Sequence, residues 1–154
     1  CHFSEQKKFD EFKFYQPVGD WKFLVKNNAG KVTSGNIQTF TTDQGKGLLT
    51  VVPYFSHTIQ KTSGVQCTDC HNSPAVEEYR AKGTMTLTTW DEATKKLKNL
   101  AGVIPVPLDW QTSLKLIYLN QDATGQWVYE GKNAADATQM LYAKPIDVSG
   151  IPKF

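Results

Sequence analysis

The motif Cys67-Thr68-Asp69-Cys70-His71 constrains this chain more than any other stretch of its 154 residues. Two cysteines are separated by two residues, and a histidine comes directly after the second cysteine. Three kinds of site use two thiols at this spacing: a covalent haem attachment, a structural zinc site and a redox-active dithiol. The pair alone is a weak signal, whereas the pair joined at once by His71 is a specific one.

Covalent haem attachment gives each of these residues a role. Thiols at positions i and i+3 reach the two vinyl groups on one edge of a porphyrin, and the next residue, His71, is carried under the iron as the proximal ligand. A structural zinc ion needs four ligands, and here Cys67 and Cys70 would need one or two of the chain's three histidines, because the sequence has no second cysteine pair. A thioredoxin-like dithiol normally comes after a strand, but the preceding residues, KTSGVQ, have the composition of a loop. We therefore predict haem c, with zinc and a dithiol as alternatives.

The stretch HTIQKTSGVQCTDCHNSPAVEEY, with LAGVIPVPLDW later in the chain, resembles the C-terminal module of bacterial multihaem c-type cytochromes. The resemblance covers about residues 47 to 120. It implies electron transfer, a short helix after the motif, and assembly in the periplasm, at the cell surface or outside the cell. One departure is plain, because a multihaem protein carries several such motifs and this sequence contains one complete copy.

A second axial ligand has four candidates, which are His2, His57, Met85 and Met140. The resemblance implies that His57 is a distal ligand, either of this haem or of a neighbouring one. Reach does not exclude the first choice, since the segment from His57 to Cys67 spans roughly 30 Å when extended. The alternative is a loop histidine that binds no metal. We expect Met85 to be a core residue on a short strand, and Met140 to pack on the apolar side of a helix.

Cys1 and His2 allow three interpretations. They are the end of a truncated haem-binding motif, which would add a second haem, or a lipidated Cys1 that tethers the chain to a membrane, or an ordinary terminus with a free thiol. No signal-peptide pattern is present, so we interpret the chain as mature or incomplete.

The composition is that of one globular domain, with 40% hydrophobic residues and a net charge of +2. This charge balance gives no reason to expect nucleic acid as a partner. Within the domain we distinguish an N-terminal arm over residues 1–16 and a haem-binding module over residues 47–120. The apolar stretches are too short to cross a bilayer.

The fold class predicted from local patterns is α+β, with short hairpins and short helices packed around a covalently bound haem. Ser73 and Pro74 begin a helix that Gly83 ends. The predicted elements are hairpins over 21–40 and 113–132, a strand over 48–52 that ends at Pro53, and helices over 74–82, 90–100 and 133–143. The second helix would be capped by Thr89 with Glu92, and the third by Asn133.

The resulting prediction is an exported electron carrier whose partners are other haem centres or redox proteins. With two axial ligands there is no open coordination position, so we do not expect catalysis. The alternatives are a subunit of a multihaem redox enzyme with an open haem site, a lipid-anchored monohaem cytochrome, and a module of a homo-oligomer, filament or membrane complex. In the last case the aromatic residues of the N-terminal arm would dock or simply pack on the domain.

Overall fold

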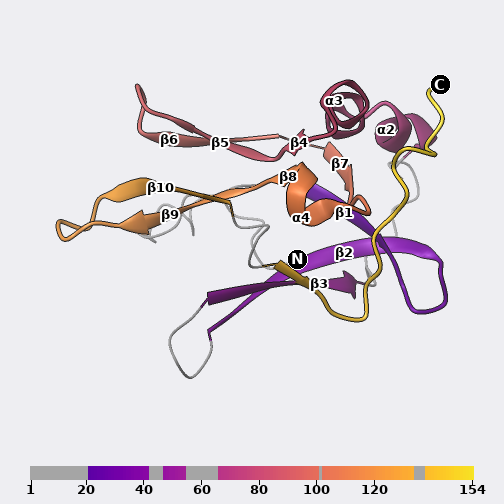
Figure 1. Ribbon diagram of the computed structural model, residues 1–154, viewed down its shortest axis with the longest axis horizontal. Coiled ribbons are helices and arrows are strands. Elements are labelled where there is room, and N and C mark those ends of the chain that lie inside the picture. Colours follow the sequence, from indigo (N-terminus) through magenta and orange to yellow (C-terminus); the bar gives the residue numbers. More distant parts are fainter. Residues whose placement is uncertain (1–20, 42–46, 55–65, 101, 134–137) are drawn as a thin grey trace.

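The computed structural model describes residues 21–41, 47–54, 66–100, 102–133 and 138–154 (Figure 1). Within these ranges the chain is mixed α+β, built mostly from strands with a few short helices. This confirms the predicted class at that level. The expected N-terminal arm, Cys1, His2 and His57 all lie outside the described residues.

Five strands form the main sheet, in the order β11-β3-β2-β1-β7. Their bounds are Trp21–Lys26 for β1, Val32–Thr41 for β2, Gly47–Tyr54 for β3, Gly102–Pro105 for β7 and Thr138–Met140 for β11. The three central strands are antiparallel, while β7 runs parallel to β1 and β11 runs parallel to β3. The first predicted hairpin is therefore confirmed, and the strand expected to end at Pro53 continues to Tyr54.

The hydrophobic core lies between this sheet and the segment C-terminal to the Cys67–His71 motif. Along β1, Phe23 and Val25 are buried whereas their neighbours are less so, as the two-residue period of a strand requires. Residues from the later segment join them, including Val76, Met85 and Ile104, each fully buried. The prediction that Met85 is a core residue on a short strand is confirmed, because β4 spans Met85–Thr86.

Two short helices cover the motif and nine of the eleven residues after it, up to Lys82. Helix α2 spans Cys67–His71 and helix α3 spans Pro74–Lys82. The Ser73 side chain accepts a hydrogen bond from the Val76 amide at 3.2 Å, and Gly83 ends α3 with a φ of 68°. The predicted helix over 74–82 is thus confirmed with both of its ends. A third helix, α4, is a single turn over Trp110–Ser113.

Two hairpins extend from the other side of the molecule, one above the other (Figure 1). The first joins β5 to β6 and the second joins β9 to β10, and a short parallel pair, β4 with β8, lies where they leave the core. Their bounds are Thr88–Asp91 for β5, Lys96–Asn99 for β6, Leu114–Lys115 for β8, Ile117–Gln121 for β9 and Trp127–Asn133 for β10. The second predicted hairpin is confirmed at β9 and β10.

The predicted helix over residues 90–100 is wrong, because this segment is the β5/β6 hairpin. Trp90 and Leu97, whose spacing also fits one face of a helix, are instead directly opposite each other in an antiparallel pair. Asp91 accepts hydrogen bonds from the amides of Ala93 and Thr94, both at 3.1 Å, and so forms a turn where the helix was expected. The apolar spacing fitted both structures, and the turn chemistry of Asp91 decided between them.

The predicted helix over 133–143 is also wrong within the described residues. Asn133, the expected cap, is the last residue of β10, and Thr138–Met140 form the edge strand β11. Their main-chain groups pair with β3, and the Leu141 amide continues this pairing by donating to Val51 O at 2.9 Å. Met140 packs partly buried against the core from this strand and not from a helix. A distant strand therefore satisfied backbone groups that a local pattern assigned to a helix.

Candidate haem-attachment site

The thiols of the motif are presented on one turn of helix. Cys67 begins α2 and is exposed, and Cys70, three residues later, is half-buried. The Asp69 carboxylate accepts a hydrogen bond from the Gln66 amide at 2.8 Å, which closes the first turn. Side chains three residues apart on a helix lie on the same face. Both thiols are therefore available to one ligand on that side.

The electrostatics of this turn differ from those of a reactive dithiol. Burial raises the pKa of the Cys70 thiol, and the neighbouring Cys67 raises it further. Redox-active Cys-x-x-Cys pairs depend on a lowered pKa that yields a thiolate nucleophile at neutral pH. At Cys70 the chain favours the thiol form, which is a weak nucleophile towards disulfides.

His71 is oriented by a hydrogen bond to a remote part of the chain. Its Nδ1 lies 2.8 Å from the main-chain oxygen of Pro152. Because a carbonyl oxygen can only accept, we assign the proton to Nδ1. The neutral ring then has its lone pair on Nε2, the nitrogen that is free to bind a metal. Metal-binding histidines in proteins generally donate their other ring N–H in this way.

Residues 151–154, which we call the strap, run beside α2 (Figure 1). The Asn72 side chain donates to Phe154 O at 3.0 Å and accepts from the Phe154 amide at 3.3 Å. The Phe154 ring lies 4.5 Å from the His71 ring, centroid to centroid, at an angle of 39°. Sequence reasoning missed the strap entirely. Its short sequence, IPKF, has no pattern that points to a histidine some eighty positions away.

The structure brings together three of the predicted site residues, which are Cys67, Cys70 and His71. Met85 is fully buried in the core, and Met140 lies on β11, so neither is placed beside the motif by its element. His57 and the Cys1-His2 pair remain predictions, since they lie outside the described residues. Within the described ranges, no group of three or more His, Cys, Asp or Glu side chains is gathered so that it could hold a metal ion.

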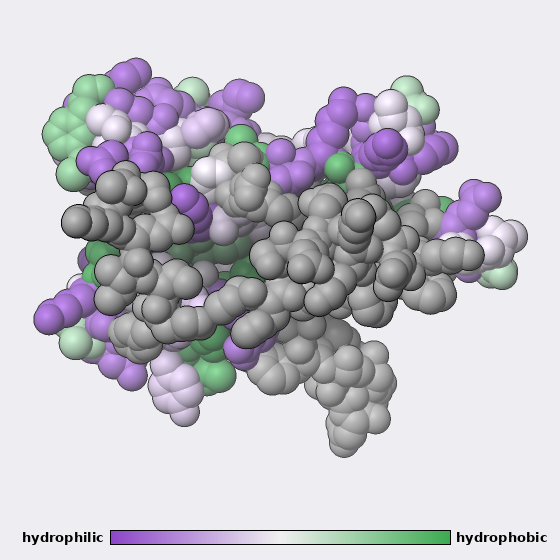
Figure 2. Space-filling view, turned by 180° about the vertical axis from the view of Figure 1, so that it is seen from behind, coloured by the Kyte–Doolittle hydropathy of each residue, from purple (hydrophilic) through white to green (hydrophobic). Residues whose placement is uncertain are grey.

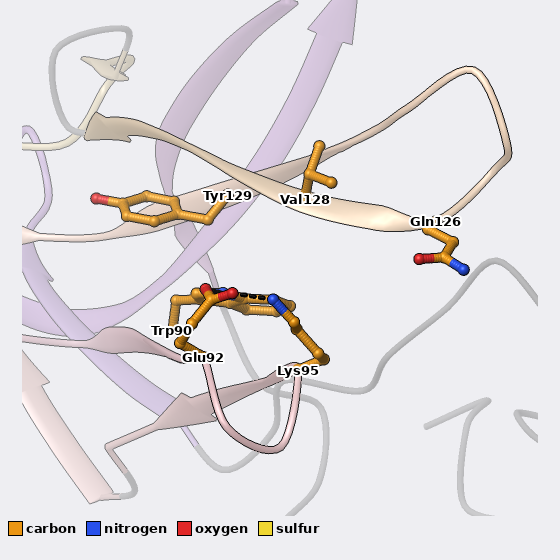
Figure 3. Close-up of a pocket in the computed structure, with 6 residues that line it drawn as sticks. All are labelled: Trp90, Glu92, Lys95, Gln126, Val128 and Tyr129. Carbon is orange, nitrogen blue, oxygen red and sulfur yellow. Dashed lines mark hydrogen bonds and ion pairs between the residues drawn. The ribbon is translucent and has the colours of Figure 1, made fainter.

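A hollowed region lies between the two hairpins, away from the Cys67–His71 motif (Figure 3). One hollow of about 520 Å³ is lined by Trp90, Glu92 and Lys95 from the β5/β6 hairpin and by residues 126, 128 and 129 of the β9/β10 hairpin. An adjoining hollow of about 450 Å³ shares Trp90 and Tyr129 with it. Glu92 accepts from Trp90 Nε1 at 2.6 Å and also pairs with Lys95, so its charge is already compensated. On the face seen in Figure 2, the described residues towards the periphery are mostly hydrophilic.

Comparison with known proteins found no matching family model, no similar curated protein and no similar solved structure. Among the helices of the described residues, none is long and apolar enough to cross a membrane.

Proposed function

We propose that this chain is a c-type cytochrome unit that carries one haem on Cys67 and Cys70, with His71 as the proximal ligand, and that it transfers electrons. The observation that carries the proposal is the bond between His71 Nδ1 and Pro152 O. It leaves Nε2 available on a residue that comes directly after two accessible thiols. A zinc-binding histidine would use the same ring geometry, so the choice of haem over zinc rests on the position of His71 directly after the second thiol of the pair.

The residues present fit such a group. Each thiol would add across one vinyl group, forming a carbon–sulfur bond while its hydrogen goes to the other vinyl carbon, so that no oxidant is required. The raised pKa of Cys70 is compatible with this addition, because the group enters the reaction as a thiol. A bound haem supplies reversible one-electron chemistry. The chain contributes a helical turn that fixes the two thiols relative to each other, and a histidine whose tautomer is fixed.

The wider setting comes from the family resemblance and stays part of the proposal. The unit would belong to a multihaem protein or assembly, with a location in the periplasm, at the cell surface or outside the cell. Its partners would be other haem centres or redox proteins. His57 is the proposed distal ligand of this or a neighbouring haem, and Cys1-His2 would belong to a second haem site or carry a lipid.

The test is to express the chain in a bacterial host that assembles c-type cytochromes and to measure the mass of the denatured protein. We expect one haem to remain on the peptide that contains Cys67 and Cys70. The double variant Cys67→Ala/Cys70→Ala should lose that haem on denaturation. The matched control is Cys1→Ala, which removes the third cysteine and should leave the haem on the Cys67 peptide unchanged.

The outcomes separate the alternatives. If the wild-type Cys67 peptide carries no haem, the proposal is wrong, and zinc content and dithiol oxidation are the next measurements. If haem is retained and the reduced protein binds carbon monoxide, a coordination position is open, and the redox-enzyme alternative replaces the electron carrier.

A further inference from the structure

Arg80 links the haem-attachment helix to the strap. Its Nη1 donates to His71 O at 3.0 Å, and its Nη2 donates to Ile151 O at 2.9 Å. The first acceptor lies in the last turn of α2, where main-chain carbonyls have no partner within the helix. One side chain therefore joins two separate main-chain segments, the second of which lies 71 positions from it in the sequence.

The guanidinium group is itself held in place. Glu77 Oε1 lies 2.7 Å from Arg80 Nη1, and the Arg80 side chain is only 23% exposed. The other oxygen of Glu77 pairs with Lys153 Nζ at 3.3 Å, which adds a second link from α3 to the strap. Helix α3 is anchored in the core by Ala75 and Val76. The guanidinium group of Arg80 is therefore carried by a helix that is itself fixed in the core.

The strap is fixed on both sides of Pro152. Arg80 holds Ile151, and Asn72 holds Phe154 through two hydrogen bonds. Ile151 also packs against the core. With its neighbours held, the Pro152 carbonyl has little freedom to turn away from His71.

We propose that Arg80 is a positioning residue, which keeps the Pro152 carbonyl on His71 Nδ1 and so fixes the tautomer and orientation of the imidazole. This inference rests on the proposed role of His71 as a haem ligand, and it names the residue that fixes the tautomer and orientation of that ligand. A hydrogen bond from the second ring nitrogen makes a metal-binding histidine more basic. A more basic ligand would stabilise the ferric form of a bound haem, so the bond would lower its reduction potential.

The test compares Arg80→Lys with Lys82→Gln in the full chain as purified. Arg80→Lys keeps the positive charge but loses the planar fork that reaches two carbonyls at once. Lys82→Gln removes a charge from the exposed end of the same helix and leaves the fork intact. Two readouts are taken: the tautomer of His71 and the exchange of its Nδ1 proton by NMR of isotope-labelled histidine, and the midpoint potential of the haem-loaded chain.

We expect Arg80→Lys to speed exchange of the Nδ1 proton at least tenfold and to raise the midpoint potential of the haem-loaded chain. In the chain without haem, where Nε2 is free to take the proton, it should also populate the other tautomer. Lys82→Gln should leave the tautomer and the exchange rate unchanged. Circular dichroism checks that both variants are folded. If Arg80→Lys does not fold, Asn72→Ala, which releases the other end of the strap, should give the same effects.

Three results bear on the inference. An unchanged tautomer and exchange rate in folded Arg80→Lys would overturn it. A potential that depends on charge alone, shifting in Lys82→Gln and not in Arg80→Lys, would overturn it too. If the chain binds no haem, the proposed function fails, but the NMR comparison still decides whether Arg80 positions His71.

Discussion

The candidate attachment site and the paired hairpins differ in the sequence separation of the contacts that hold them. The strap reaches α2 and α3 through hydrogen bonds between residues 71 to 82 positions apart. The polar contacts within the β5/β6 and β9/β10 hairpins are local, between residues two to four positions apart at Glu92 and Asp122. The geometry of His71 therefore depends on the fold being complete, whereas each hairpin is shaped largely by its own turn.

The two regions should therefore respond differently to damage. Loss of core packing should release the strap early, because most of the hydrogen bonds that hold it come from residues far away in the sequence. A change within a hairpin should alter stability and hydrogen exchange in that hairpin and have little effect at His71. Four kinds of change test this contrast, in order of decreasing expected effect. They are made in the core, at the hairpin junction, in the backbone and in charge.

The largest effect is expected at Met85, which is fully buried between the two regions. Met85→Ala should lower the free energy of unfolding by about 2–5 kcal/mol, because it leaves a cavity in the core. Urea denaturation monitored by tryptophan fluorescence measures this loss. Hydrogen exchange should show loosening of the strap as well as of β4.

The control is Met85→Leu, which conserves most of the volume and should cost less than about 1.5 kcal/mol. Equal losses in the two variants would contradict a packing role. Met85 would then again be a candidate for a role of its sulfur atom.

The next effect is expected at the junction of the hairpins, where Thr88 is 2% exposed. Its hydroxyl accepts from the Ile117 amide at 2.8 Å and lies 3.2 Å from Ile117 O, to which it donates. Thr88→Val would remove the hydroxyl that both part-buried Ile117 main-chain groups bind, and should cost about 1–3 kcal/mol. Thermal unfolding measures the loss, and amide exchange should increase in β5 and β9 but not at Ile151.

Thr89→Val is the matched control, because Thr89 is exposed on the other side of the same strand. It should change stability by less than about 0.5 kcal/mol. If the two valine variants are alike, the junction is not held by the Thr88 hydroxyl.

The same contrast explains which parts of the fold could be predicted from the sequence. The helix over 74–82 could be, because Ser73, Pro74 and Gly83 define its ends within the segment itself. The β9/β10 hairpin could be, because Asp122 forms its turn locally, accepting from the amides of Thr124 and Gln126. Both predictions relied on turn and cap chemistry that needs no distant partner.

The failures arose where apolar spacing alone was used or where the partner is far away. Trp90 and Leu97 fit one face of a helix by spacing, but they also fit opposite positions of a hairpin. Thr138–Met140 pair with β3, nearly ninety positions earlier, which no local pattern could indicate. At the site, Cys67, Cys70 and His71 were found by their motif, while Arg80 and Pro152 were missed because their roles depend on the chain returning to α2.

A backbone change should give a smaller effect at Gly83, which ends α3 with a φ of 68°. An added Cβ would meet no atom within 4 Å, so the cost of Gly83→Ala is that of the left-handed backbone alone. We expect a loss of about 1 kcal/mol in thermal unfolding. Because Arg80 lies in the last turn of α3, exchange at the strap should also rise.

Gly131→Ala is the matched control, since Gly131 in β10 has a φ of 75° and equally open space. Its cost in unfolding should be similar, but its effect on exchange should stay within the β9/β10 hairpin. Strap exchange that rises equally in both variants would contradict the separation of the two regions.

The smallest effect is expected from pH at Asp91, in the turn of the β5/β6 hairpin. The Lys98 ammonium, 2.5 Å from Asp91 Oδ2, together with the Thr94 amide, lowers the pKa of Asp91 from 3.8 to about 2. A carboxyl whose pKa is lower in the folded state stabilises that state above its unfolded pKa. Its contribution is therefore complete above pH 3.8 and is lost as the pH falls towards 2. Fluorescence of Trp90 at about 0.05 M salt, recorded from about pH 5 to pH 2, should report this loss as a small change at the hairpin, as expected for an exposed pair.

Asp91→Asn should remove this change in fluorescence at low pH, because the variant has no carboxyl group to protonate. Lys98→Gln should move the change to higher pH, because it removes the main cause of the lowered pKa of Asp91. Raising the salt concentration to about 1 M should shrink the difference between wild type and Lys98→Gln, since exposed charges are then screened beyond about 3 Å. Throughout, the His71 Nδ1 proton should exchange at the same rate in Asp91→Asn as in the wild type. A faster rate would mean that the hairpin and the strap are coupled. It would contradict the contrast between hairpins held by local contacts and a strap held by distant ones.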